Sequence, residues 1–319
     1  MPVLHAEDRE GSFVPHAFAE HSVDLGEIRM NYVVTGEPDR PALLLIPAQT
    51  ESWWGYEQAL PLLAEHFQVH AVDLRGQGRS TWTPGRYTLD VFGNDLVRFI
   101  DLVIGRPTLV SGLSSGGVLA AWLSAYAKPG QVRAAVYEDP PLFASEVNPA
   151  CGPSIRQGAG PLFAAWSKWL GDQWSIGDWR GLQQALPDEL PAALRPRSAS
   201  FDADAVREPP QHLREYDPEW ARSFVSGRAT VGCDHETMLS GVRVPVLLTH
   251  HSRQIDPGTG HLLGAIADVQ VQRVRELVEA AGQPFTYRSF PDQPHSLHEA
   301  DPELYARTVI EWAEGLPAA

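Results

Sequence analysis

Short apolar runs alternate with helix-length segments along most of this chain, and this alternation constrains the fold more than any other feature. Residues 42–46 are apolar at every position, as expected for a strand buried on both faces of a sheet. Strands are also predicted over residues 28–35, 67–74, 108–111, 132–137, 244–249 and 285–290. Strands that alternate with helices predict an α/β fold with a mostly parallel central sheet flanked by helices.

The alternation stops between Glu138 and Val242. This stretch is rich in proline and tryptophan, with helices expected near residues 161–170 and 179–186. Because it is too long for a loop inside a compact domain, we predict a helical lid inserted between two strands, above the sheet's ligand crevice. The predicted domains are an N-terminal arm over residues 1–22, a core over 23–141 and 242–319, and a lid over 142–241.

Composition narrows the range of partners. The 319 residues include 25 basic and 40 acidic side chains, a net charge of −15, whereas nucleic acids and anionic membranes are bound by basic surfaces. Cys151 and Cys233 are too few for a disulfide scaffold, and no metal-ligand pair has convincing spacing. Without a signal-like or membrane-spanning apolar run, we expect a cytoplasmic protein that needs no cofactor and binds a small molecule, with homo-oligomerisation left open.

The strongest chemical motif is Gly-Leu-Ser-Ser-Gly-Gly over residues 112–117. It fits G-x-S-x-G, directly after a predicted strand and before an amphipathic helix, which is the context of a nucleophile elbow. We predict that Ser114 is the nucleophile and that the Ser115 amide donates to a developing oxyanion. The alternative is a glycine-rich turn that packs closely or holds a phosphate.

A serine nucleophile needs a histidine base, and twelve histidines compete for that role. His295 is preferred because it lies on the loop between the last predicted strand and the closing helix. His298 is expected to be exposed or at the helix entry, and His250 and His251 end a strand that could border the pocket.

The acid that orients the base is open among three residues. Glu138 ends the strand after the nucleophile helix and is preferred. Asp256 follows the strand over residues 244–249, which is the usual position, although the intervening loop is long. Asp139 is the third candidate; as an alternative to a triad role, Glu138 and Asp139 could cap a turn before two prolines.

The second oxyanion donor is expected in the loop over residues 47–50. Gln49 is the first choice and Ala48 the second. The glycines at 76 and 78 are too sparse for a phosphate cradle and predict a sharp turn instead.

Several of these features together resemble the α/β-hydrolase fold: Leu-Arg-Gly-Gln-Gly-Arg-Ser over residues 74–80, the elbow, the insertion and the late His295. More narrowly, the chain resembles the zearalenone hydrolases, which open the macrocyclic lactone of a fungal mycotoxin. That resemblance implies Glu138 as the acid, an oxyanion donor at Pro47-Ala48-Gln49, and lid tryptophans against the resorcylate ring. The candidate tryptophans are Trp166, Trp174, Trp179 and Trp220. Most α/β-hydrolases carry His-Gly where this chain has Pro47-Ala48.

The resulting hypothesis is a serine hydrolase, a lactonase that opens the ester bond of a bulky aromatic macrolactone, zearalenone first, through a Ser-His-Glu triad and an acyl-enzyme. Two other α/β-hydrolase activities stay open, a general carboxylesterase and a carbon–carbon bond hydrolase. A third alternative is a ligand receptor on the same fold that turns its ligand over slowly.

Overall fold

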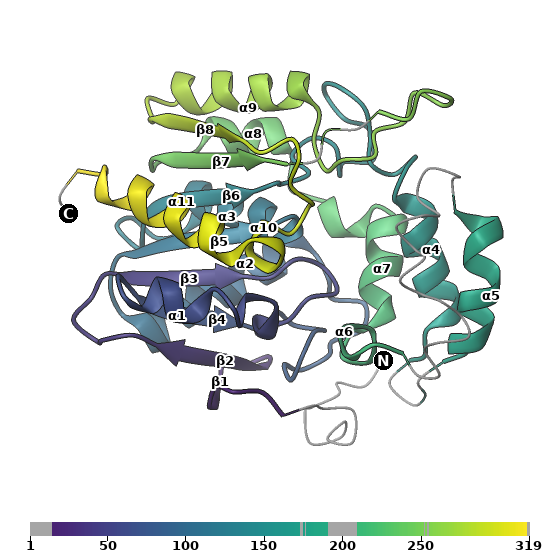
Figure 1. Ribbon diagram of the computed structural model, residues 1–319, viewed down its shortest axis with the longest axis horizontal. Coiled ribbons are helices and arrows are strands. Elements are labelled where there is room, and N and C mark those ends of the chain that lie inside the picture. The colour runs from purple at the N-terminus through teal and green to yellow at the C-terminus, as the bar shows by residue number, and fades with distance from the viewer. Residues whose placement is uncertain are drawn as a thin grey trace.

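The computed structural model describes residues 15–172, 175, 177–190, 209–251, 253 and 255–317. Its centre is an eight-stranded sheet in the order β1-β2-β4-β3-β5-β6-β7-β8, in which β1, β2 and β4 pair antiparallel and all other neighbours pair parallel (Figure 1). The strands are β1 (Glu20–Asp24), β2 (Arg29–Thr35), β3 (Ala42–Ile46), β4 (Gln68–Val72), β5 (Thr108–Leu113), β6 (Val132–Glu138), β7 (Val246–His250) and β8 (Phe285–Ser289).

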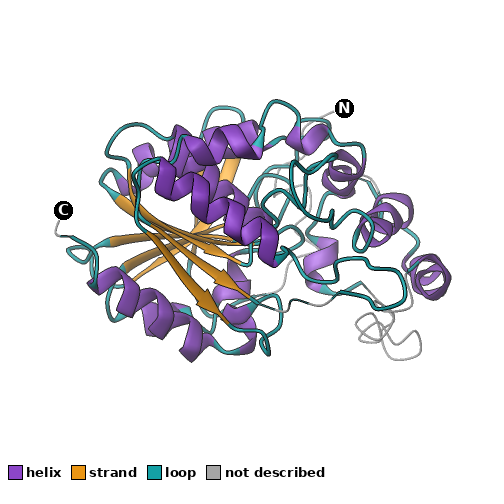
Figure 2. Ribbon diagram, turned by 90° about the horizontal axis from the view of Figure 1, so that it is seen from above, coloured by secondary structure: helices purple, strands orange, loops and turns teal. Residues whose placement is uncertain are grey.

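Helices cover both faces of this sheet (Figure 2). In β3 the side chains alternate: Leu44 and Ile46 pack into one core layer, and Leu43 and Leu45 into the other. The first layer lies under α2 (Leu89–Phe99), α3 (Ser115–Tyr126), α8 (His235–Ser240) and α9 (Asp268–Ala280), and the second under α1 (Leu60–Ala64) and α11 (Pro302–Glu314). The described residues also form four short helical elements: η2 (Trp53–Tyr56), η3 (Ile100–Ile104), η5 (Arg228–Thr230) and α10 (Leu297–Ala300).

The predicted fold class is confirmed, and each predicted strand overlaps an observed one. The strand that was not predicted is β1, which begins at Glu20, inside the stretch expected to form an N-terminal arm. Its five residues are half-buried or exposed, because β1 is an edge strand paired only with β2, so it carries no continuous apolar run.

Between β6 and β7 the described residues include four helices that lie beyond the carboxyl ends of the strands (Figures 1 and 2). We call residues 142–241 the insertion; these helices are α4 (Gly160–Trp169), α5 (Trp179–Glu189), α6 (Gln211–Arg214) and α7 (Pro218–Val225). Helix α4 contacts both α5 and α7, whereas α8, at the end of the same stretch, packs on α3 and α9 of the core. None of the helices in the described ranges is long and apolar enough to cross a membrane.

Candidate active site

Ser114 stands on a sharp turn between β5 and α3. Its backbone has φ 54° and ψ −119°, and its amide donates a 2.8 Å hydrogen bond to the carbonyl of Glu138 on β6. A Cβ on Gly112 would lie 2.2 Å from the Gly116 carbonyl oxygen, and one on Gly116 would lie 2.3 Å from that of Ile46. The turn therefore requires glycine on both sides of the serine, which is the strand–turn–helix context expected of a nucleophile elbow.

His295 is oriented by Asp139. The Nδ1 of His295 donates a 2.6 Å hydrogen bond to Oδ2 of Asp139, and the other carboxylate oxygen accepts the His251 amide at 3.0 Å. Asp139 is 1% exposed, while the side chain of His295 is 44% exposed. A buried carboxylate on Nδ1 fixes the imidazole so that Nε2 is free to accept a proton, which is the arrangement of a catalytic base.

Glu138, the preferred acid, does not orient His295. Its carboxylate accepts the amides of Leu297 and His298 at 3.0 and 3.2 Å, and the Nδ1 of His298 at 2.9 Å. The prediction that Glu138 orients His295 is thus corrected: Asp139 occupies that position. Asp256 is corrected as well, because its carboxylate accepts hydrogen bonds from Thr259 and Gly258 of its own loop, while Nδ1 of His295 is bonded to Asp139.

His298 lies at the entry of α10, which is one of the two positions expected for it, but it is fully buried and not exposed. Its ring stacks on Tyr56 with the ring centroids 3.8 Å apart. Burial alone would raise the pKa of Glu138, but the charge and hydrogen bond of His298 outweigh it and hold that pKa below its usual value. Glu138 and His298 therefore form a buried ion pair that ties the loop carrying His295 to the end of β6.

The hydrogen bond between Asp139 and His295 affects how the activity should depend on pH. Burial lowers the pKa of His295, but the hydrogen bond and charge of Asp139, with the charges of Glu51 and Glu138, raise it to a net value above the ordinary 6.5. Because only neutral His295 can accept a proton, we expect kcat/KM for an ester to fall as the pH drops through this raised pKa. A pH profile of kcat/KM measures it, and a limb centred below 6.5 would contradict the assignment.

The oxyanion loop follows β3, and neighbouring side chains occupy two of its amides. The Ala48 amide donates to Oε2 of Glu51 at 3.2 Å, and the Thr50 amide donates to Oε1 of Gln77 at 2.6 Å. Between them, the amide of Gln49 has no acceptor within the described part of the chain. Gln49, together with Ser115 at the first turn of α3, is therefore better placed than Ala48 to bind an oxyanion.

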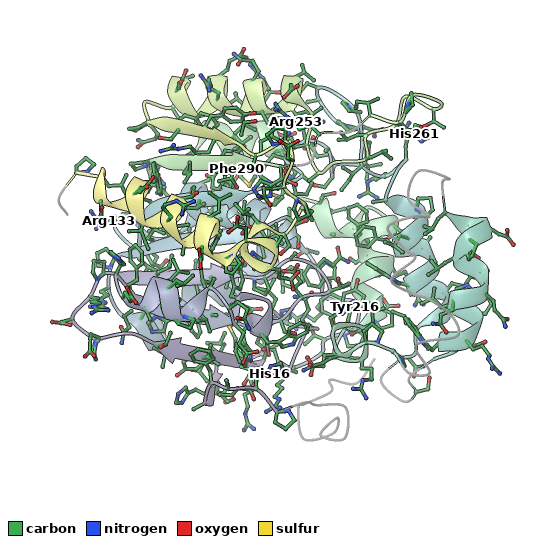
Figure 3. All side chains as sticks on the ribbon, in the orientation of Figure 1. His16, Arg133, Tyr216, Arg253, His261 and Phe290 are labelled. Carbon is green, nitrogen blue, oxygen red and sulfur yellow. The ribbon has the colours of Figure 1, made fainter. Side chains whose placement is uncertain are left out.

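Sequence reasoning missed the residues that hold this loop. Gln77 also donates to the Ala48 carbonyl at 3.1 Å, and Tyr216 (Figure 3) accepts the Gln49 side-chain amide at 2.6 Å from between α6 and α7. The sharp turn predicted around Gly76 and Gly78 exists, and both glycines have positive φ. Only the fold shows that this turn carries Gln77 to the oxyanion loop.

A cavity of about 250 Å³ joins these groups. Ser114, Ser115, Gln49, Glu51 and His295 form its polar side. Its apolar walls come from the core and from the insertion, with Leu89, Phe92, Val118, Leu119, Ile155, Phe163, Trp166, Trp220 and Phe224. Within the described ranges no group of three or more His, Cys, Asp or Glu side chains could hold a metal ion.

The four candidate tryptophans separate into three groups. Trp166 and Trp220 line the cavity, and the Trp220 ring lies 4.5 Å from that of Phe92, centroid to centroid. Trp179 packs into the apolar core at the start of α5 and is not among the described residues that line this cavity. Trp174 lies outside the described residues. Two tryptophans therefore contribute to the cavity wall.

Curated hydrolases resemble part of this chain in sequence. The chain is 26% identical over 124 residues to 3-oxoadipate enol-lactonase 2 of Acinetobacter baylyi, covering 39% of this chain and 42% of that protein. It is 33% identical over 139 residues to bifunctional epoxide hydrolase 2 of Sus scrofa, covering 43% and 24%. The matched region is thus less than half the length of either relative.

Solved structures match over most of the chain. A hydrolase from Pseudomonas aeruginosa PA01 superposes with a TM-score of 0.66 and 21% identity, covering 94% of this chain and all of that one. The enol-lactonase from Burkholderia xenovorans LB400 superposes with a TM-score of 0.64 and 18% identity, covering 92% of this chain and all of that one. The model of the alpha/beta hydrolase family matches residues 43–308, and the chain therefore belongs to the α/β-hydrolase family.

Proposed function

We propose that this protein is a serine hydrolase of carboxylic esters and lactones with the triad Ser114, His295 and Asp139. The observation that carries the proposal is the 2.6 Å hydrogen bond between His295 and Asp139, on a cavity that Ser114 also lines. A nucleophile, an oriented base and two amide donors around one cavity are the parts that acyl transfer needs.

In the first half of the reaction, Ser114 Oγ attacks the substrate carbonyl and His295 Nε2 takes its proton. The Gln49 and Ser115 amides stabilise the oxyanion, and Asp139 stabilises the imidazolium. Collapse expels the alcohol, which takes the proton from His295, and leaves an acyl-enzyme on Ser114. Water activated by His295 then releases the acid and restores the serine.

The serine nucleophile favours a carbonyl substrate over an epoxide, although epoxide hydrolases are among the relatives. A serine oxygen that opened an epoxide would become part of an ether, which water does not cleave under mild conditions. A serine oxygen that attacks an ester or lactone becomes an acyl ester, which the same base can hydrolyse. Ser114 therefore supports ester and lactone hydrolysis.

Among lactones, we propose zearalenone as the first substrate to test. The aromatic wall of Phe92, Phe163, Trp166 and Trp220 suits a flat, apolar ring. The sequence resemblance to zearalenone hydrolases points to the same substrate class. It also implies that the ring-opened acid loses carbon dioxide.

A second candidate is a smaller ester or lactone. The cavity of about 250 Å³ is slightly below the range of about 300–1,000 Å³ typical of sites for drug-sized ligands, so a small substrate fits without rearrangement. The enol-lactonase relatives favour this class as well. Occupation by a macrolactone would require the insertion to move away from the core.

The two candidates are separated by one set of assays. We expect wild-type protein to convert zearalenone to a product heavier by one water, or to its decarboxylated form, as followed by mass spectrometry. Rapid turnover of short nitrophenyl esters and small lactones, with zearalenone untouched, would favour the second candidate. If none of these substrates is hydrolysed, the proposed function is wrong.

A further inference from the structure

The cavity contains a second carboxyl group that the triad mechanism does not use. Glu51, four residues into the loop that begins after β3 at Pro47, lines the same cavity as Ser114 and His295, and its side chain is 18% exposed. Its Oε2 accepts the Ala48 amide, which fixes the carboxyl beside the oxyanion loop. Among the described residues no hydrogen bond reaches its Oε1, so this oxygen can accept one from a molecule in the cavity.

Behind Glu51 lies the Glu138–His298 pair. The Nε2 of His298 is 3.8 Å from Oε2 of Glu51, while its Nδ1 donates to Glu138. The other groups that act on Glu51 are Glu299 from α10, His295 from the preceding loop and Tyr56 from η2. His298 thus places a cationic ring between two carboxylates, and its charge favours the ionised form of Glu51 against the effect of burial on the Glu51 pKa.

We propose that Glu51 holds the water that hydrolyses the acyl-enzyme, and that it thereby favours water over an alcohol as the acceptor. This inference rests on the proposed function, because it concerns the second half of that reaction. Water has two hydrogens: one is given to His295 Nε2, and the other is donated to Glu51. An alcohol has only one, which His295 takes, and so it leaves the carboxylate without a donor.

The step is balanced without further reactants. The water oxygen attacks the acyl carbon, its first proton passes to His295 Nε2, and the carbonyl electrons move to the oxyanion. The second hydrogen stays on the new acid group, hydrogen-bonded to Glu51 throughout. Collapse breaks the bond between the acyl carbon and Ser114 Oγ, which takes back the proton from His295.

For a lactone this preference has a direct consequence. The alcohol released by ring opening stays tethered to the acyl chain and can attack the acyl-enzyme again, which would re-form the substrate. A carboxylate that binds water better than an alcohol favours hydrolysis of the acyl-enzyme over re-formation of the lactone. Glu51 thereby makes the opening of the ring productive.

Glu51 accepts the stronger, charge-assisted hydrogen bond from water only when it is ionised. Burial raises its pKa to about 7, against the opposing charge of His298 and with a further rise from Glu299. The rate of deacylation is therefore expected to increase as the pH rises through about 7. In Glu51→Gln the increase of the deacylation rate around pH 7 that is due to Glu51 should disappear, while the pH dependence due to His295 remains.

The test compares wild type with Glu51→Gln at a pH well above 7, using p-nitrophenyl benzoate and zearalenone with methanol as a competing acceptor. We expect the ratio of methyl ester to free acid to rise about tenfold in the variant, because a charge-assisted hydrogen bond to water is lost. Release of nitrophenol should develop a burst, since deacylation slows while acylation continues. Thermal melting checks that the variant is folded.

Glu299→Gln serves as the matched control. Glu299 is exposed and raises the Glu51 pKa through its charge. Removing the Glu299 charge should shift the pH dependence of the deacylation rate to lower pH. At a pH well above 7 the ratio of methyl ester to free acid should stay unchanged.

An unchanged methanol ratio in folded Glu51→Gln would overturn the inference, as would an equal fall in acylation and deacylation rates. Wild type that releases no nitrophenol and opens no lactone would instead refute the proposed function, and the inference with it.

Discussion

Ser114→Ala is expected to lower kcat by about 10⁵-fold or more, because removing a triad nucleophile costs about as much as removing the whole triad. Ester hydrolysis is measured in the steady state, and mass spectrometry tests for an acyl-enzyme, which alanine cannot form. The fold should persist, since alanine is smaller than serine and the turn is fixed by Gly112 and Gly116.

Ser115→Ala is the matched control. It keeps the amide that donates to the oxyanion and removes only a buried hydroxyl that has no partner among the described residues. We expect its kcat to stay within about tenfold of wild type. Full turnover by Ser114→Ala would refute the mechanism, and equal losses in both variants would show that the turn, not the nucleophile, had been damaged.

Asp139→Asn is expected to lower kcat by about 10⁴-fold with little loss of stability. The amide can no longer hold His295 in the tautomer that accepts the serine proton, nor stabilise the imidazolium. The His295 limb of the pH profile should also shift to lower pH, because the charge of Asp139 raises the pKa of His295.

Glu138→Gln replaces the neighbouring carboxylate by an amide in the same way, but it should lower stability and leave kcat nearly unchanged. Loss of the charge opposite buried His298 is expected to cost about 3 kcal/mol of unfolding free energy, with kcat changed by about tenfold or less in the folded fraction. Denaturant titration and kcat, measured for both variants, separate the two roles. A catalytic collapse in Glu138→Gln with Asp139→Asn near normal would restore Glu138 as the triad acid.

The features that the sequence could predict are those set by local pattern. Apolar runs such as residues 42–46 predict buried strands, and the glycines around Ser114 predict a tight strand-to-helix turn, because both depend on neighbouring residues alone. The position of His295 between the last strand and the closing helix predicts its place at the sheet edge.

The choice between Glu138 and Asp139 depends on a backbone turn that no local pattern shows. Glu138 ends β6 opposite Leu113 and Thr249, whereas Asp139 has φ 40° and turns towards His295. The sequence contains two adjacent acids, Glu138 and Asp139, and two histidines three residues apart, His295 and His298, and this pattern could have been used. They indicate two acid–histidine pairs, of which one can be structural.

Glu51 and Gln77 were missed for a similar reason. Gln77 lies 29 residues from Ala48, whose carbonyl it binds, and the packing of the β3 loop against the turn after β4 brings the two together. Glu51 is only three residues from the Ala48 amide that it accepts, but the cavity that it shares with His295 appears only in the fold.

Because Asp139, which orients His295, follows β6, the segment over residues 255–263 after β7 carries none of the groups that the proposed mechanism uses. Instead it braces the insertion: a Cβ on Gly158 would lie 2.5 Å from the Leu262 carbonyl oxygen, next to the segment that carries Ile155 to the cavity. Directed evolution could therefore vary residues 255–263 to reshape the substrate range, whereas His251 has to be kept, because its amide holds Asp139 and its ring contacts the His295 carbonyl.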